Sequence, residues 1–189
     1  MTSDSIAHFN QIAEVWARVA GLDPSVRDAA LDAACIPAGG AVLDAGCGSG
    51  LLLPALLSRI GSGGRIVALD GARRMLAIAA RQTPDPRIRY VCLNLSDYDG
   101  GDGPFDTEVC CRLLLHLHDP SAVLARMAGW LRPDGWLVVF HEGDRDEETA
   151  AQAASLQDGG FQVCSAFQAY GLSAWVCRKA GHQARPDAR

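Results

Sequence analysis

The sequence contains no stretch in which lysines and arginines gather into a basic stripe, and its formal net charge is −5 over 189 residues. This absence argues against a protein that follows the phosphate backbone of a nucleic acid, although it leaves room for a local basic patch. Aromatic residues make up only 6% of the chain and are not interleaved with basic ones, which also disfavours binding to single-stranded nucleic acid. The composition therefore disfavours DNA or RNA as a partner.

No apolar run approaches the length that spans a bilayer, and the first residues lack the basic flank and apolar core of a signal peptide. The seven cysteines are odd in number and form no CxxC pair, which disfavours a disulfide framework or a zinc site. Most of them fall inside apolar runs, as buried thiols in a reducing compartment do. We expect a cytoplasmic protein with no membrane partner and no bound metal.

The length suits one domain, and its central part alternates between two kinds of segment. Short apolar segments of strand length alternate with amphipathic segments of helix length, which predicts parallel β-α-β units with helices on both faces of the sheet. The expected strands are 41–45, 65–70, 88–93, 107–111 and 136–140, and the helices between them are 51–60, 72–82 and 120–131. Helices over 5–20 and 24–35 precede this part, and a helix over 147–156 and an antiparallel pair, 161–167 and 172–177, follow it.

A glycine-rich turn, Val42-Leu43-Asp44-Ala45-Gly46-Cys47-Gly48-Ser49-Gly50, follows the first expected strand. Glycines allow a sharp bend and let a ligand approach the main chain, at the strand end where open α/β sheets bind ligands. The turn does not match the dinucleotide pattern GxGxxG, because leucines stand where the third glycine would be. A nicotinamide-dependent oxidoreductase is therefore disfavoured but is kept as an alternative.

Two acidic residues indicate what the turn could bind. Asp44 adjoins the glycines, where a carboxylate is unfavourable for a pyrophosphate but favours an ammonium or a sulfonium. Asp70 ends the second strand, where an acid can accept hydrogen bonds from both ribose hydroxyls of a nucleoside. Because we expect Asp70 to lie outside the core, we expect it to add little to stability.

Four segments, in this order and spacing, carry a resemblance over about residues 40–180: VLDAGCGSG, RIVALDGARRMLAIA, FDTEVCCRLLLHLHDP and LRPDGWLVVF. The chain resembles the class I S-adenosylmethionine-dependent methyltransferases, in particular their small-molecule, methyltransferase-11-like branch. The resemblance implies an α/β fold with a doubly wound, seven-stranded, mostly parallel sheet of Rossmann-like type whose last strand is antiparallel. It also implies S-adenosyl-L-methionine as the cofactor and a small molecule as the methyl acceptor.

The resemblance assigns roles around the cofactor. Asp44 and the backbone of Gly46, Gly48 and Gly50 would hold the methionine part, and Asp70 would bind the ribose. Asn94 stands where the family usually has an Asp that takes the adenine amino group; its side-chain oxygen can accept that bond without a negative charge. An alternative interpretation of Asn94 is an ordinary turn residue. The other residues expected at the cofactor are Cys47, Gly71, Met75, Leu95 and Cys111.

Histidines at two strand ends are the candidates for acid-base chemistry on the acceptor. His116 follows the fourth strand, and His141 ends the fifth. His118 precedes a capping aspartate and is interpreted as a loop residue. A metal site built from these histidines and Glu142 is an alternative that nothing in their spacing favours.

Residues 1–38 are expected to form a helical lid, 39–180 the methyltransferase core domain and 181–189 a disordered tail. Trp16 could belong to the lid or, together with Phe9, to the apolar stripe of its own helix. Between the fifth strand and the closing hairpin there is room for one short helix, so the acceptor pocket must be shallow or be completed by the lid or another subunit, as in a homodimer. This short region motivates a second hypothesis, that the chain is a cofactor-binding regulatory or partner subunit without its own transferase activity.

Overall fold

The computed structural model describes residues 1–142, 146–169 and 171–180. Its centre is a seven-stranded sheet with the order β3-β2-β1-β4-β5-β7-β6. The strands are β1 (Ala41–Ala45), β2 (Arg65–Asp70), β3 (Ile88–Cys92), β4 (Phe105–Cys111), β5 (Leu131–Glu142), β6 (Phe161–Ala169) and β7 (Leu172–Lys179). Strands β1 to β5 pair in parallel, whereas β7 is antiparallel to both of its neighbours. The expected doubly wound, mostly parallel sheet with an antiparallel last strand is confirmed.

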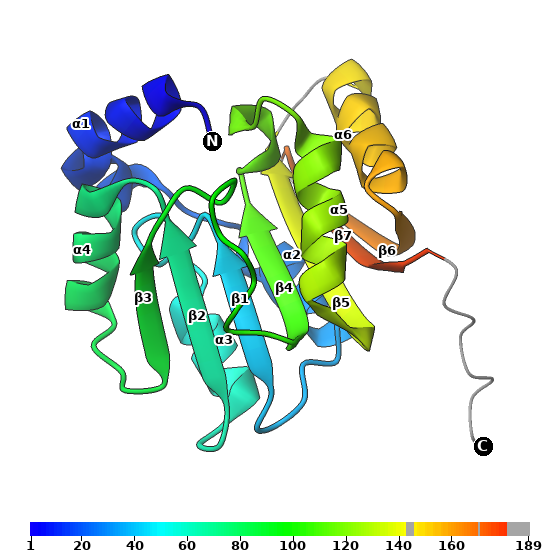
Figure 1. The fold of residues 1–189 in the computed structure, drawn as a ribbon, viewed down its shortest axis with the longest axis horizontal. Coiled ribbons are helices and arrows are strands. Elements are labelled where there is room, and N and C mark those ends of the chain that lie inside the picture. Colours follow the sequence, from blue (N-terminus) through cyan, green and yellow to red (C-terminus); the bar gives the residue numbers. More distant parts are fainter. Residues whose placement is uncertain (143–145, 170, 181–189) are drawn as a thin grey trace.

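Helices cover both faces of the sheet, as the alternation predicted (Figure 1). Helices α2 (Pro24–Ala33), α3 (Leu53–Ile60) and α4 (Arg73–Gln82) share one buried apolar cluster with the sheet. Helices α5 (Pro120–Trp130) and α6 (Asp146–Asp158) lie on the opposite face with the segment after β3. A capping aspartate and a following proline begin both α2 and α5, and these residues fix where each helix starts.

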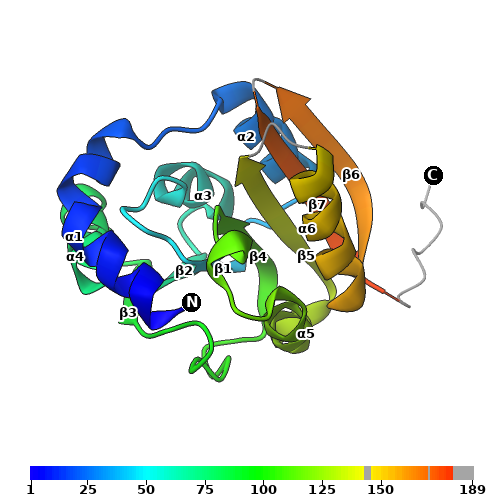
Figure 2. The ribbon, with the colours of Figure 1, turned by 90° about the horizontal axis from the view of Figure 1, so that it is seen from above.

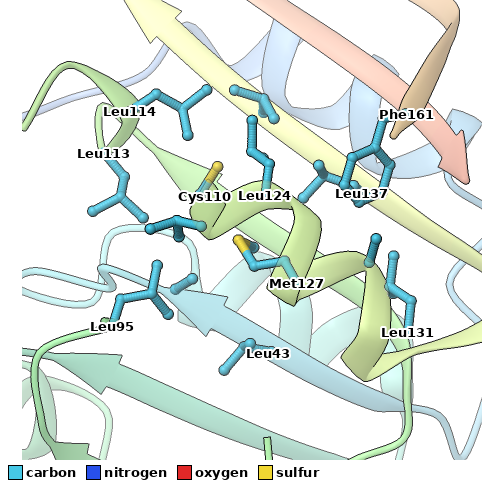
Figure 3. Packing of buried hydrophobic residues seen from close by; sticks show 14 of the residues in the cluster. Leu43, Leu95, Cys110, Leu113, Leu114, Leu124, Met127, Leu131, Leu137 and Phe161 are labelled. Carbon is cyan, nitrogen blue, oxygen red and sulfur yellow. The ribbon is translucent and has the colours of Figure 1, made fainter. Parts of the chain in front are cut away.

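The strands in the middle of the sheet contribute side chains to both cores. All five residues of β1 are buried, with Val42 in the cluster beneath α2 and α3 and Leu43 in the cluster beneath α5. Leu124 and Met127 of α5 lie over this second face of the sheet (Figure 3). Burial on both faces explains why the strands read as continuous apolar runs in the sequence.

The elements agree with the sequence prediction except at their ends. Strand β5 begins at Leu131, because Leu131 pairs with Phe105 beside an irregularity in the register of β4. The expected turn at 132–135 therefore lies within the bounds of β5. Strands β6 and β7 are longer than expected because they pair with each other along their whole length. Pairing between strands is a tertiary feature, and the composition of one segment does not reveal it.

Helix α1 (Ser3–Val19) lies apart from the sheet and packs on α4. Phe9, Ala13 and Trp16 contact a small buried cluster that includes Met75 and Ile78. Figure 2 looks onto the carboxyl ends of the parallel strands and shows α1 running over α4, with the N-terminus near the centre. This position suits the expected lid, whose boundaries remain a prediction, and the expected tail 181–189 lies outside the described residues. Among the described residues, no helix is long and apolar enough to cross a membrane.

One buried side chain has no evident structural purpose. Glu108 in β4 is fully buried, and neither of its carboxyl oxygens has a hydrogen-bond partner among the described residues. Its neighbours across the sheet are Leu43 and Leu137. Burial raises the pKa of the Glu108 carboxyl well above its ordinary value, so folding favours the neutral, protonated form.

We expect Glu108→Met to stabilise the protein by about 1–3 kcal/mol at neutral pH, because the variant removes an unsatisfied buried polar group at similar volume. Since the pKa of Glu108 is raised by folding, its contribution to stability is fully present below the unfolded-state pKa and is lost as pH rises toward the folded-state pKa. Urea unfolding at pH 5, 6, 7 and 8 should show a free energy of unfolding that falls with rising pH in the wild type. In the Met variant it should fall less steeply. Glu108→Gln keeps a polar group but cannot titrate. It should reduce the dependence of the free energy of unfolding on pH, without the stabilisation expected for Glu108→Met. A Met variant less stable than wild type at every pH would contradict this account.

Candidate functional site

A cavity opens at the carboxyl ends of β1, β2 and β4, beside α1. The empty space in it is about 610 Å³ with the open mouth included. It is lined by Met1, Phe9, Trp16, Ala20, Asp44, Gly46, Cys47, Gly48, Ser49, Leu51, Leu52, Asp70, Met75, Cys111, Arg112, Leu113 and His116. The cavity thus gathers most of the residues that the sequence predicted for the cofactor.

The three glycines of the turn all have positive φ, but their surroundings differ. A Cβ atom added at Gly46 would lie 2.8 Å from the Leu113 side chain, and one at Gly50 would lie 2.9 Å from the Leu53 side chain and 3.1 Å from that of Ala79. A side chain at either position would therefore press on its neighbours, and the positive φ adds backbone strain for any residue other than glycine. A Cβ at Gly48 would meet nothing within 4 Å, so the backbone at Gly48 faces the open cavity. Gly48 is the glycine whose backbone a ligand can approach.

Asp44 is a buried carboxylate beside this turn. It is 1% exposed, and its Oδ2 has no hydrogen-bond partner among the described residues although the residue lines the cavity. Burial, and then the charge of Asp70, raises the pKa of Asp44 to about 7. A carboxylate so poorly stabilised favours a positively charged ligand group beside it.

Asp70 is more deeply built into the turn than the sequence analysis expected. Its Oδ2 accepts a 2.8 Å hydrogen bond from the Gly48 N–H, and its Oδ1 accepts a 2.7 Å bond from the Ala72 N–H. The residue is 5% exposed, and burial raises its pKa despite these two bonds. Asp70 therefore does not lie outside the core as expected, and because its side chain joins the glycine turn to the start of α4 we expect it to contribute to stability. Its proposed contact with a ribose stays a prediction.

Asn94 does not line the cavity directly, because Met1 lies against it. The Asn94 Oδ1 accepts a 2.6 Å hydrogen bond from the Met1 nitrogen, and the Asn94 Nδ2 donates a 2.8 Å bond to the Met1 carbonyl. Leu95 is buried in the core beneath α5. A Cβ at Gly71 would lie 2.8 Å from Ile6 of α1, so Gly71 also lies beneath this helix. A ligand can reach the Asn94 carboxamide only if Met1 moves.

His116 lies on the cavity wall, in the short 3₁₀ helix η1 (Leu114–His116). Its ring meets the Phe9 ring edge-on at 4.9 Å, and the Phe9 ring in turn meets the Trp16 ring at 5.6 Å. Burial, and then the neighbouring His8, lowers the pKa of His116, so its imidazole is neutral at pH 7. A neutral imidazole can accept a proton from a ligand in the cavity.

His141 occupies a different environment from His116. It is 1% exposed, and its ring stacks at 6.0 Å on the ring of Trp175 from β7. His141 and His118 are not among the residues that line the cavity. The structure therefore does not bring His141 to His116, and a role for His141 on the acceptor stays a prediction. The described residues contain no group of three or more His, Cys, Asp or Glu side chains arranged for a metal ion, and the Glu142 side chain lies outside the described part.

Comparison with known proteins identifies the family. The family model described as "Methyltransferase domain" matches residues 43–139, just over half of the chain. The chain belongs to this methyltransferase family. The match begins inside β1 and ends inside β5, so it contains the glycine turn, Asp70 and the His116 segment.

Curated relatives of this methyltransferase include enzymes named for ubiquinone biosynthesis. The chain is 31% identical over 115 residues to the ubiquinone biosynthesis O-methyltransferase of Thiobacillus denitrificans, covering 59% of this chain and 48% of that protein. It is 32% identical over 106 residues to the protein of the same name from Xanthomonas axonopodis pv. citri, covering 54% of this chain and 43% of that one. The chain thus spans about half the length of the curated relatives it matches.

Solved structures share the fold along almost the whole chain. A TehB-like S-adenosylmethionine-dependent methyltransferase from Corynebacterium glutamicum has a TM-score of 0.72 at 24% identity, with 92% of this chain and 98% of that chain covered. A similar enzyme from Aquifex aeolicus has a TM-score of 0.69 at 18% identity, with 91% and 97% covered. These likenesses confirm the Rossmann-like methyltransferase fold that the sequence motifs implied.

Several residues of the cavity wall were not among those predicted from the sequence, and Arg112 is the charged one among them. Arg112 follows β4 directly and has a positive φ of 53°, so the chain turns sharply there. The sequence signal was present, since a basic residue stands at a strand end of the ligand-binding edge.

Proposed function

We propose that this chain binds S-adenosylmethionine over its glycine turn and transfers the methyl group to a hydroxyl of a small molecule. The observation that carries the proposal is Asp44, a buried carboxylate with an oxygen lacking a partner among the described residues, beside a glycine backbone that faces a cavity. Family membership supports the reaction, and the names of the curated relatives support oxygen as the acceptor atom.

The residues present fit the methyl donor. Asp44 would bind its ammonium group, which removes the unfavourable burial of an unpaired carboxylate. Gly48 would let the methionine part approach the main chain, and Asp70, already fixed by two backbone N–H groups, would receive the ribose hydroxyls. When bound, S-adenosylmethionine supplies a methyl group on a positively charged sulfur.

The protein's part in the chemistry is mostly orientation. The wall of Phe9, Trp16 and His116 presents flat surfaces to an acceptor. His116, neutral at pH 7, would take the proton of the acceptor hydroxyl at a ring nitrogen, leaving a more nucleophilic oxygen. Holding that oxygen in line with the methyl group then lowers the barrier, because it converts a bimolecular encounter into an oriented one.

A small acceptor also agrees with the shape of the site. Among the described residues between β5 and β6 there is one helix, α6, whereas α1 supplies the wall opposite the glycine turn. The chain's own N-terminal helix therefore covers one side of the cavity. A homodimer that completes the acceptor side further stays a prediction.

We expect His116→Ala to lower the turnover number about 100-fold or more while S-adenosylhomocysteine binds within a few-fold of wild type, because a general base acts only in the transition state. Calorimetry with S-adenosylhomocysteine and with NAD measures the donor site. Methylation of a catechol, followed by product chromatography, measures the turnover number. The wild type should bind S-adenosylhomocysteine and not NAD.

His118→Ala is the matched control, since His118 is two residues away and does not line the cavity. Its turnover number should stay near that of the wild type. If His116→Ala keeps full turnover, proximity alone carries the reaction and His116 is not the base. If the wild type binds NAD and not S-adenosylhomocysteine, the proposed function is wrong.

A further inference from the structure

The N-terminal helix α1 holds His116 from outside its own segment. The His116 carbonyl accepts a 3.2 Å hydrogen bond from the N–H of Thr2, the residue that caps α1. The His116 ring meets the Phe9 ring at 4.9 Å between centroids, with an angle of 88° between the two ring planes. Both contacts join segments that are far apart in the chain, so they form only when α1 packs in this place.

The imidazole of His116 is oriented by packing and not by a hydrogen bond. Among the described residues, neither of its ring nitrogens has a hydrogen-bond partner, and Phe9 is the aromatic residue whose ring meets it. A general base is commonly oriented by a third group that hydrogen-bonds to it. The covalent geometry of histidine restricts rotation of its ring about χ2 only weakly. At His116 the perpendicular Phe9 ring therefore supplies the restriction that a hydrogen bond supplies elsewhere.

Phe9 is itself anchored well enough to hold a neighbouring ring. It packs against the small buried cluster that includes Met75 and Ile78 of α4, and its ring meets the Trp16 ring at 5.6 Å and 72°. Phe9 and His116 both line the cavity. The orientation of the imidazole is thus set from α4, through Phe9, at the wall of the site.

The Phe9 contact also bears on the charge of the imidazole. Burial, and then His8 of α1 and the Met1 nitrogen, lowers the pKa of His116. Because burial is the largest cause, removing the Phe9 ring should expose the imidazole to solvent and raise this pKa toward its ordinary value. The charged side chains that line the cavity with His116 are Asp44, Asp70 and Arg112.

We infer that Phe9 is a positioning residue for His116, whose ring fixes the imidazole in the orientation from which it takes the proton of the acceptor hydroxyl. This inference rests on the proposed function. Phe9 moves no proton itself and acts only through His116. The effect on rate is large because a displacement of about 1 Å in a reacting group can cost about 100-fold.

The test compares Phe9→Leu, which keeps an apolar side chain without a ring, with Phe9→Tyr, which keeps the ring. Proton NMR follows the titration of the His116 ring, whose signal is assigned by its absence in His116→Ala. Phe9→Leu should raise the pKa of His116, and Phe9→Tyr should keep it near that of the wild type. Since the base must be neutral to act, the fall of kcat/KM at low pH should move to higher pH in Phe9→Leu.

Methylation of a catechol gives the second measurement. Phe9→Leu should lower the turnover number about 10-fold or more, change the KM for the catechol by less, and leave S-adenosylhomocysteine binding within a few-fold. Phe9→Tyr should restore the turnover number to within a few-fold of wild type. Phe167→Leu is the matched control, because it makes the same substitution on β6, outside the cavity, and should change none of these values.

A double variant tests whether Phe9 acts through His116. If it does, Phe9→Leu combined with His116→Ala should turn over no more slowly than His116→Ala alone, because the group that Phe9 positions is already absent. A further loss of about 10-fold in the double variant would mean that Phe9 contributes independently of the base, which overturns the inference.

The outcomes separate this inference from the proposed function. A Phe9→Leu variant that raises the KM but keeps the wild-type turnover number would make Phe9 a binding surface for the acceptor, which overturns the inference alone. An unchanged pKa of His116 in Phe9→Leu also overturns it, and this measurement needs no acceptor. A wild type that does not bind S-adenosylhomocysteine refutes the proposed function instead.

Discussion

Asp44→Asn should weaken the binding of S-adenosylhomocysteine about 10- to 100-fold, while the ligand-free protein stays at least as stable as wild type. The loss follows from removing the charge that faces the ligand ammonium, since hydrogen bonds to charged groups contribute about 1.5–3 kcal/mol. The substitution should not lower the free energy of unfolding of the ligand-free protein, because Asp44 is a buried carboxylate and its Oδ2 has no hydrogen-bond partner among the described residues. Calorimetry and urea unfolding measure the two effects separately.

The binding should also depend on pH in a defined direction. Because the pKa of Asp44 is raised to about 7, its carboxyl is mostly protonated at pH 6 and mostly ionised at pH 8. The ionised form binds the ammonium, so affinity should rise about 10-fold over this interval. The same raised pKa means that stability of the ligand-free protein falls as pH rises through 7. Asp44→Asn should flatten the affinity profile; an unchanged profile would assign the titration to another group.

Gly48→Ala should lower the affinity for S-adenosylhomocysteine by more than 10-fold, or about 1.4 kcal/mol, in a protein that still folds. The new methyl group would project into the open side of the turn, where no protein atom lies within 4 Å and where the ligand would approach. The positive φ of 55° adds a backbone cost of about 1–2 kcal/mol to the stability of the ligand-free protein.

Gly39→Ala provides a matched control for that backbone cost. Gly39 also has a positive φ, of 80°, with nothing within 4 Å of an added Cβ, but it precedes β1 at the opposite edge of the sheet. Both variants should lose similar thermal stability, and only Gly48→Ala should lose affinity. Equal affinity in the two variants would mean that the ligand does not lie over the glycine turn.

Asp70 and Gly50 illustrate where sequence patterns mislead about roles. Both belong to the motif that predicted the cofactor site, yet Gly50 packs against α3 and α4, and Asp70 holds the turn through two backbone N–H groups. A motif reports which residue types occur together, but not whether each one faces a ligand or its neighbours. Burial and hydrogen-bond partners, which depend on the approach of other segments, separate these cases.

The sequence alone determined the family, the order of strands and helices, and the edge of the sheet at which the site lies. These follow from local information, namely the apolar periodicity of each segment, the turn residues between them, and the rule that parallel strands present their carboxyl ends together. The tertiary structure decided which candidate side chains meet. It joined His116 to Phe9 of α1, buried His141 against Trp175, covered Asn94 with Met1 and brought Arg112 into the cavity wall. Each of these contacts depends on how α1 and β7 pack against segments far away in the chain, and no local pattern encodes that packing.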